Sequence, residues 1–369
     1  MKVLTVVGTR PEVIRLSRVL PCLDRAFDHV LVHTGQNWDY LLNGVFFHEM
    51  GLRPPDRVLS VDTSSVGAVL ADTLRKTEEV LDLEKPNAFL VLGDTNSAIS
   101  AVMAKRMQIP VYHMEAGNRC FDENVPEEVN RRLVDHVSDF NLVYTEHARR
   151  NLLAEGLQPR RVVLTGSPMR EVLDYYQPQI EASSVLSILG LKDMGYFLVS
   201  AHRQENVDSP GRLRALLQCL RAVRTKWGLP VLVSTHPRTR ARMQSVVADL
   251  DLAGIQFCEP FGFHDYNKLQ TRAFCVLSDS GTISEECALL GFPAITLRSS
   301  IERPEALDTG SIVMTDLDVA SVLAAVRAVT SERTPRAIPV DYQVNDCSIR
   351  VRNLLLSTAS QHRAWAGLR

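Results

Sequence analysis

The sequence predicts two α/β domains, each a doubly wound parallel sheet with helices on both faces. Three observations predict this fold class. Short apolar runs alternate with longer segments of helical period, which is the pattern of strands that are buried on both faces. The length of 369 residues is roughly twice that of an ordinary domain. Hydrophobic residues make up 45% of the chain and charged residues 23%, as is typical of folded domains.

The first half of the chain begins with a strand over Lys2–Val7 and a turn at Gly8–Arg10. Pro11 suits the first position of the helix that follows, because its missing N–H costs nothing there. Another helical stretch is expected from about Ser97. The remaining strands of this half are predicted at Val30–His33, Ala88–Leu92, Val111–Met114, Phe140–Tyr144 and Val162–Leu164.

The second half repeats this rhythm after a pause at Gly166–Pro168. We therefore predict one domain over residues 1–168 and a second over 169–345, and a final helical stretch over about Ser348–Arg363. Strands of the second domain are predicted at Tyr196–Ala201, Val231–Ser234, Ile255–Cys258, Cys275–Ser278 and Ala294–Leu297, and helices at Arg212–Trp227, Arg238–Leu250 and Ser284–Leu290.

Charge and hydropathy exclude several classes of protein. The chain has 41 Lys and Arg against 43 Asp and Glu, a net charge of −2, so no general attraction to nucleic acid or anionic membrane is expected. No apolar run approaches the roughly 18 residues of a membrane-spanning helix. Arg10 and Glu12 interrupt the apolar stretch that follows Met1, which argues against a signal peptide.

Cysteine and histidine spacing predicts neither disulfides nor a metal site. The seven cysteines are scattered and include no C-x-x-C pair, and the ten histidines include no H-E-x-x-H pattern. Free thiols in a reduced cytoplasm are the simplest account. The sequence also has no G-x-G-x-x-G motif and no Walker loop, so no nicotinamide cofactor is expected.

Polar clusters follow many of the predicted strands. Ligands of open parallel sheets bind beyond the carboxyl ends of the strands, and two domains that present such edges to one another would form a cleft. We therefore expect the functional residues in these clusters, which are Gly8–Arg10, Gly93–Thr95, Glu115–Arg119, His202–Glu205, His236–Arg238 and Ser278–Thr282.

Two of the clusters are candidates for binding phosphate. Gly8–Arg10 and Ser280–Thr282 each lie between a strand and a helix, and a helix N-terminus with small residues favours anions. Glu285 and Glu286 follow one turn later and suit ribose hydroxyls. The alternative for Gly8–Arg10 is an ordinary strand-to-helix turn with an exposed arginine. The alternative for Ser280–Thr282 is an N-terminal cap in which Glu285 or Glu286 serves the helix dipole.

Three acids, Asp94, Glu115 and Glu127, are candidates for acid and base chemistry. Clustered carboxylates raise one another's pKa, which makes them usable near neutral pH. Taken alone, each acid is more readily explained as a structural residue, Asp94 as a helix cap and Glu127 as a first-turn acid, but the set together with Arg131 and His202 favours a functional site. His202 and His236 end predicted strands and Arg303 stands in a loop, where they would meet a diphosphate or lie as ordinary structural or surface residues.

Taken in order, these motifs resemble the non-hydrolysing UDP-N-acetylglucosamine 2-epimerase family over nearly the whole chain. The motifs that carry the resemblance are Gly8–Glu12, Gly93–Thr95, His113–Gly117, Pro126–Arg131, Ala201–Arg203, Asp279–Gly281, Glu285–Glu286 and Glu302–Glu305. The resemblance implies two Rossmann-like domains of glycosyltransferase-B-like architecture, with a C-terminal helix, within 346–369, that returns to the first domain. It also implies a homodimer that needs no metal or cofactor.

The activity implied by the resemblance is inversion of C2 of a UDP-2-acetamido sugar, by anti elimination of UDP to a 2-acetamidoglycal and re-addition. This would serve the synthesis of surface polysaccharide precursors. Matching positions assign catalysis to Asp94, Glu115, Glu127, His202 and Arg131, and substrate or UDP binding to Arg10, Arg15, His236, Tyr266, Ser280, Gly281, Thr282, Glu286 and Arg303.

Several positions depart from the family pattern. Arg15 replaces a lysine of many relatives, Thr282 replaces a glycine, and Gln36–Tyr40 differs from a segment that helps to bind an activating second substrate in bacterial relatives. Gly117–Asp122 and His202–Asp208 resemble the branch that forms UDP-N-acetyl-L-fucosamine from a UDP-2-acetamido-2,6-dideoxy-L-hexose. The alternatives are a retaining glycosyltransferase of the same fold, a hydrolysing 2-epimerase and an inactive sugar-nucleotide sensor.

Overall fold

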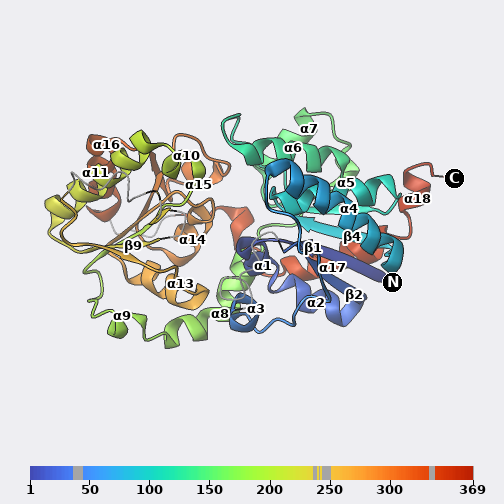
Figure 1. Cartoon of the computed structure of the whole chain (residues 1–369), viewed down its shortest axis with the longest axis horizontal. Coiled ribbons are helices and arrows are strands. Elements are labelled where there is room, and N and C mark those ends of the chain that lie inside the picture. The colour runs from blue at the N-terminus through green and yellow to red at the C-terminus, as the bar shows by residue number, and fades with distance from the viewer. Residues whose placement is uncertain (36–44, 236–238, 241, 243–250, 332–336, 369) are drawn as a thin grey trace. The chain divides into compact units, whose positions relative to one another are not determined.

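Buried aliphatic and aromatic residues build two separate parallel sheets in the computed structural model of the chain (Figure 1). The structure describes residues 1–35, 45–235, 239–240, 242, 251–331 and 337–368. Unit 1 comprises Met1–Asp174 and Val340–Arg369, and unit 2 comprises Tyr175–Pro339.

The sheet of unit 1 has seven parallel strands within the described residues, in the order β3-β2-β1-β4-β5-β6-β7. Its central strands are continuous apolar runs because helices cover both faces; every residue of β4, for example, is buried. The strands are β1 (Lys2–Val7), β2 (Asp28–His33), β3 (Arg57–Val58), β4 (Ala88–Leu92), β5 (Val111–Ala116), β6 (Phe140–Val143) and β7 (Val162–Leu164).

Helices cover the two faces of this sheet with two apolar cores. One core joins the first two helices and α17 to the sheet, and the other joins α4, α5 and α6 to it. The helices are α1 (Arg10–Leu16), α2 (Val19–Ala26), α3 (Val45–Glu49), α4 (Val66–Glu84), α5 (Ala101–Arg106), α6 (Pro126–Val137), α7 (Glu146–Ala154), α8 (Met169–Ala182), which runs on into unit 2, α17 (Cys347–Thr358) and α18 (His362–Trp365), with 3-10 turns at Asn96–Ser100, Pro159–Arg161 and Val340–Gln343.

Helix α17 belongs to unit 1 although it lies far along the chain from the other helices of that unit. It packs beside α2 (Figure 1), and its Cys347, Val351 and Leu355 are buried in the same core as β1. The Tyr112 and Thr358 hydroxyls, 2.7 Å apart, add a hydrogen bond between β5 and α17. The core of unit 1 is therefore built from both ends of the sequence.

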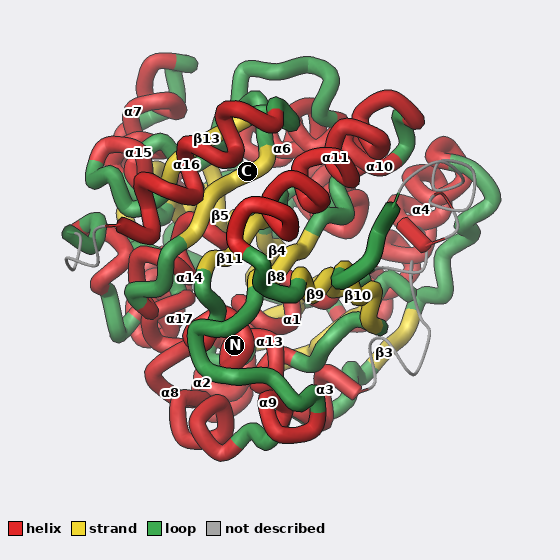
Figure 2. Tube along the Cα trace, turned by 90° about the vertical axis from the view of Figure 1, so that its left-hand side faces the viewer, coloured by secondary structure: helices red, strands yellow, loops and turns green. Residues whose placement is uncertain are grey.

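Unit 2 has a six-stranded parallel sheet within the described residues, in the order β10-β9-β8-β11-β12-β13; β8, β9 and β10 lie side by side in Figure 2. The strands are β8 (Phe197–Ser200), β9 (Val231–Ser234), β10 (Ile255–Cys258), β11 (Cys275–Ser278), β12 (Ala294–Leu297) and β13 (Val313–Thr315). The helices are α9 (Val185–Ile188), α10 (Gln204–Val207), α11 (Pro210–Trp227), α13 (Phe263–Arg272), α14 (Ile283–Leu290), α15 (Glu305–Asp308) and α16 (Val319–Ser331).

The predicted fold class is confirmed by two parallel sheets of the Rossmann-like kind. The short edge strands β3 and β13 were not predicted from the sequence. The helix predicted over Ser348–Arg363 is in fact two helices, α17 and α18. Most of the helix predicted over Arg238–Leu250, together with Gln36–Tyr40, lies outside the described residues.

The described residues contain neither a candidate membrane span nor a candidate metal-binding cluster. No helix in them combines the length and the apolar character needed to span a bilayer. No group of three or more His, Cys, Asp or Glu side chains among them is arranged to hold a metal ion.

Candidate active site

The turn after β1 is held by a buried carboxylate. Thr9 caps α1 and forms a capping box with Glu12. One oxygen of Glu12 accepts hydrogen bonds from the backbone N–H groups of Gly8 and Thr9, both at 2.6 Å. The other accepts from the hydroxyls of Thr95 and Ser97, at 2.7 and 2.6 Å. Glu12 thus ties the turn after β1 to the turn after β4, and its burial raises its pKa.

Arginines 10 and 15 lie on successive turns of α1 but in different surroundings. Arg10 is the first residue of the helix and is partly exposed. Arg15 is buried, donates a hydrogen bond to the carboxylate of Glu115 and lies 5.9 Å from the ring centre of Tyr144. Arg15 therefore orients an acid of the candidate site, whereas Arg10 keeps surface for a ligand.

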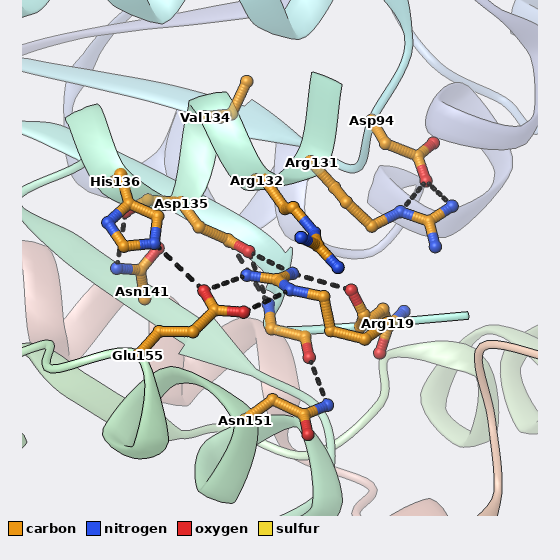
Figure 3. A network of polar contacts seen from close by, with 12 residues as sticks. Asp94, Arg119, Arg131, Arg132, Val134, Asp135, His136, Asn141, Asn151 and Glu155 are labelled. Atoms are coloured by element: carbon orange, nitrogen blue, oxygen red, sulfur yellow. Dashed lines mark hydrogen bonds and ion pairs between the residues drawn. The ribbon is translucent and has the colours of Figure 1, made fainter. Parts of the chain in front are cut away.

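Asp94 lies just beyond the carboxyl end of β4. One of its oxygens accepts hydrogen bonds from Nε and Nη2 of Arg131, at 2.9 and 2.6 Å (Figure 3). Asn130 donates to the Asp94 carbonyl at 3.0 Å. Helix α6 thus fixes both the side chain and the backbone of Asp94, while about a third of the side chain stays exposed, at 29%.

Glu115 lies at an irregularity in β5. The pairing of β5 with β6 shifts between Met114 and Ala116, and the backbone of Glu115 is left-handed, with φ of 64°. Such a conformation costs a non-glycine residue roughly 1–2 kcal/mol. A bulge changes the direction of a side chain at the end of a strand, and here the Glu115 carboxylate meets Arg15 and the Asn118 amide.

Two adjacent glutamates in the first turn of α6 have different surroundings. Glu127 is partly exposed and accepts no hydrogen bond from any described residue. Glu128 is buried and accepts bonds from Arg131 at 3.0 Å and from the N–H and thiol of Cys120. Burial tends to raise the pKa of Glu128, but these bonds and the charge of Arg131 outweigh it and lower the pKa. Glu127 is therefore the available carboxylate and Glu128 the bound one.

In unit 2, Asp279 organises the segment after β8. Its buried carboxylate accepts hydrogen bonds from the backbone N–H groups of His202 and Arg203 and from the Asn206 side chain, all at 3.1 Å. The ring of His202 lies 3.5 Å from the same carboxylate and is 48% exposed. Asp279 thus holds the backbone of a segment that presents the His202 ring to solvent.

The Ser280–Thr282 segment connects β11 to α14. The two hydroxyls are 3.0 Å apart, and the Thr282 N–H points to the Ser280 hydroxyl at 3.3 Å. A Cβ on Gly281 would lie 3.4 Å from the Arg203 guanidinium, so this glycine leaves room beside an arginine. Small hydroxyl residues and a cation at the start of a helix form a suitable anion site.

Buried polar pairs lie behind this segment. Gln270 of α13 donates to Glu286 of α14 at 2.6 Å. Arg303 is buried and donates to Glu285. Arg303, predicted to meet a ligand, therefore has a carboxylate partner of its own inside unit 2.

The structure brings some of the predicted residues together and leaves others apart. In unit 1, Arg15 pairs with Glu115, and Arg131 pairs with Asp94. Tyr266 lies on α13, which also carries the Gln270 partner of Glu286. His236 lies outside the described residues.

Four residues that hold the candidate groups in place were not predicted in that role from the sequence: Glu12, Glu128, Gln270 and Asp279. Glu12 had a signal, because Thr9 followed three residues later by Glu is a capping box. The others had no comparable local signal, since their partners are distant in sequence or depend on which helix face is buried.

Comparisons with known proteins agree with one another. Residues 22–356 match the family model described as UDP-N-acetylglucosamine 2-epimerase. A solved structure of UDP-N-acetylglucosamine 2-epimerase from Rickettsia bellii is 42% identical, with a TM-score of 0.92 and complete coverage of both chains. The Methanocaldococcus jannaschii enzyme, solved with UDP-GlcNAc and UDP, is 31% identical, with a TM-score of 0.91 over 97% of this chain and 100% of that one.

A relative named for a different substrate has a sequence identity close to that of the Methanocaldococcus jannaschii enzyme. UDP-2,3-diacetamido-2,3-dideoxy-D-glucuronate 2-epimerase of Pseudomonas aeruginosa is 33% identical over 320 residues, covering 85% of this chain and 88% of its own. Similarity at this level therefore leaves the sugar open.

Proposed function

The chain belongs to the UDP-N-acetylglucosamine 2-epimerase family, a family of isomerases, and we propose that it inverts C2 of a UDP-2-acetamido sugar without net hydrolysis. The observation that carries this proposal is the set of three carboxylates in unit 1. Asp94 and Glu115 are each oriented by an arginine, and Glu127 is partly exposed at the start of α6.

The reaction needs more than one acid or base. A carboxylate removes the proton from C2, the C1–O bond to UDP breaks, and its electron pair leaves with the diphosphate as a C1–C2 double bond forms. UDP then adds back to C1 while a proton reaches the opposite face of C2. A C2–H without a neighbouring carbonyl is barely acidic, so a well-placed base and a stabilised leaving group are both required. Asp94, Glu115 and Glu127 are the proposed acids and bases.

The arginines are proposed to act in two ways. Arg131 and Arg15 keep Asp94 and Glu115 in fixed orientations, which lowers the reorganisation needed during proton transfer. Arg10, partly exposed at the N-terminus of α1, is proposed to contact the diphosphate. The departing negative charge is thus met by a guanidinium and a helix N-terminus.

Unit 2 is proposed to bind the nucleotide. Ser280, Gly281 and Thr282 would meet the phosphates with the His202 ring, and Glu286, held by Gln270, would accept hydrogen bonds from the ribose hydroxyls. Tyr266 of α13 would lie against the uracil, and His236 and Arg303 are further nucleotide candidates.

Proton NMR in deuterated water tests the proposal. UDP-N-acetylglucosamine and a UDP-2-acetamido-2,6-dideoxy-L-talose are supplied separately, and deuterium is expected at C2 of the epimer with one of them. The faster sugar identifies the substrate branch. Stoichiometric free UDP would instead indicate a hydrolysing enzyme, and tight UDP binding without exchange would favour a transferase or a sensor.

Amide variants test the carboxylates. Glu115→Gln and Glu127→Gln should lower epimerisation at least about 100-fold, while UDP binding measured by calorimetry is retained. Glu78→Gln is the matched control, because Glu78 is an exposed glutamate on α4. Normal turnover in both test variants would contradict the assignment.

We also propose that the protein works as a homodimer in a reducing cytoplasm. None of the seven cysteines forms a disulfide within the described residues, which supports a reducing compartment. Light scattering of the purified chain tests the dimer, and a mass of 41.2 kDa would indicate a monomer.

A further inference from the structure

A buried carboxylate outside the proposed catalytic set lies behind the Glu115 bulge. Asp135 of α6 is fully buried, so it has no access to a substrate. Both of its oxygens lie 3.2 Å from the Gly117 N–H, which donates to them, and one accepts from Arg119 at 2.7 Å. Gly117 and Arg119 lie two and four residues after Glu115, so Asp135 holds the segment that follows the bulge.

The same segment is held from α7 as well (Figure 3). Arg119 donates two hydrogen bonds to Glu155, at 2.8 and 2.7 Å, and Asn151 donates to the Gly117 carbonyl at 3.0 Å. Gly117 has a φ of 81°, and a Cβ there would lie 2.4 Å from the Ala148 carbonyl oxygen. The backbone that follows Glu115 is thus fixed in a conformation that only glycine fits.

Asp135 also contacts His113 of β5, whose ring reaches the turn after β4 that carries Asp94. The buried His113 ring lies 2.9 Å from Asp135 through Nδ1 and 2.7 Å from the Gly93 carbonyl through Nε2. Gly93 immediately precedes Asp94. One carboxylate therefore faces the backbone segments that carry two of the proposed acids.

We propose that Asp135 is a positioning residue for Glu115 and Asp94, and this rests on the proposed epimerase function. Asp135 sets the relative position of the two carboxylates by fixing the backbone after Glu115 and, through His113, the backbone before Asp94. Loss of its charge weakens the hold on Arg119 and on the Gly117 N–H, and this loosens the backbone that keeps Glu115 in its left-handed conformation.

Asp139 provides a matched control on the same stretch of chain. It is also fully buried and also meets two cations, Lys105 at 2.5 Å and Arg161 at 3.0 Å. It accepts a bond from the N–H of Val111, at the opposite end of β5 from Glu115. Neutralising Asp139 therefore disturbs a comparable buried ion cluster away from the proposed acids.

The experiment compares Asp135→Asn with Asp139→Asn. Both should lower the melting temperature. Asp135→Asn should also lower kcat about 30- to 100-fold, because misplacement of a catalytic group by about 1 Å costs that much, with the Kd for UDP unchanged within about twofold. Asp139→Asn should keep kcat within about threefold of the unaltered protein. Equal kcat values in the two variants would overturn the proposal.

Hydrogen exchange gives a readout that does not depend on turnover. Asp135→Asn should speed amide exchange in the peptide spanning residues 115–122, and Asp139→Asn should not. Equal exchange in that peptide would count against the positioning role. If Asp135→Asn does not fold, Asn151→Ala removes only the bond to the Gly117 carbonyl and should lower kcat about fivefold; an unchanged kcat there would likewise overturn the proposal.

Glu115→Gln, measured in the same assay, distinguishes failure of the proposed function from failure of the positioning role. An active Glu115→Gln variant would contradict the proposed function, whatever the activity of Asp135→Asn. An inactive Glu115→Gln variant together with a fully active Asp135→Asn variant would leave the function standing and remove the positioning role alone.

Discussion

Gly8→Ala tests the close packing of three segments of unit 1: the turn after β1, the residue after β2 and the turn after β4. A Cβ on Gly8 would lie 2.4 Å from the Thr34 hydroxyl oxygen and 2.8 Å from the Ser97 Cβ. Carbon contacts normally settle at about 3.5–4.0 Å, so the turn after β1 has to move by roughly 1 Å. That shift also strains the 2.6 Å bond from the Gly8 N–H to Glu12.

The magnitude of the Gly8→Ala effect follows from this geometry. Overpacking of this kind costs about 1–3 kcal/mol, which corresponds to a fall of roughly 2–12 °C in the melting temperature of a domain of this size. A displacement of about 1 Å next to the proposed acids costs about 100-fold in kcat. We therefore expect a modest loss of stability and a large loss of activity.

The assay follows thermal unfolding and C2 proton exchange in the same preparations. Gly67→Ala in α4 is the matched control, since its Cβ would meet only the Ser65 hydroxyl at 3.9 Å, and alanine within a helix stabilises by about 0.5–1 kcal/mol. A Gly8→Ala variant with an unchanged melting temperature and activity within twofold would refute the reasoning.

Three further predictions follow from buried and half-buried polar groups. Arg119 lowers the pKa of Glu155 from 4.5 to about 2, so Glu155→Gln should lower the free energy of unfolding by at most about 3 kcal/mol above pH 5. In urea unfolding this loss of stability should shrink as the pH falls from 4.5 toward 2. A loss of stability that does not depend on pH would contradict the prediction. Gln270→Leu removes the hydrogen bond to Glu286 and should weaken UDP binding about five- to tenfold, as measured by calorimetry. An unchanged Kd for UDP would show that this hydrogen bond does not support nucleotide binding. Burial raises the pKa of the Cys120 thiol from 9.0 to about 11, so its alkylation at pH 8 should be about 100-fold slower than that of a free thiol, and labelling at the free-thiol rate would disprove it.

The central strands of both sheets were predictable from hydropathy. β1, β4, β9, β11 and β12 have the predicted limits, because burial on both faces demands an uninterrupted apolar run. β3 comprises only Arg57 and Val58, neither of them buried. An edge strand needs no such run, so hydropathy did not reveal it.

The candidate acids were predictable to the extent that strand ends determine their position. Asp94 follows β4, and Glu115 lies near the end of β5, where parallel sheets bind ligands. The different surroundings of Glu127 and Glu128 were not predictable, since neighbouring helix positions differ only in which face is buried. The role of Asp135 was hidden for a related reason, because its partners stand 16 to 22 positions away.

The return of residues 340–369 to unit 1 affects the order in which a nascent chain matures. All of unit 2 leaves the ribosome before α17 does, so unit 2 completes its fold first. Until then, Leu20 and Leu23 of α2 lack the apolar cover that Val351 and Leu355 supply. A chain that ends before residue 340 therefore has a folded second unit and an exposed apolar surface on the first unit. Chaperones and proteases recognise such a state.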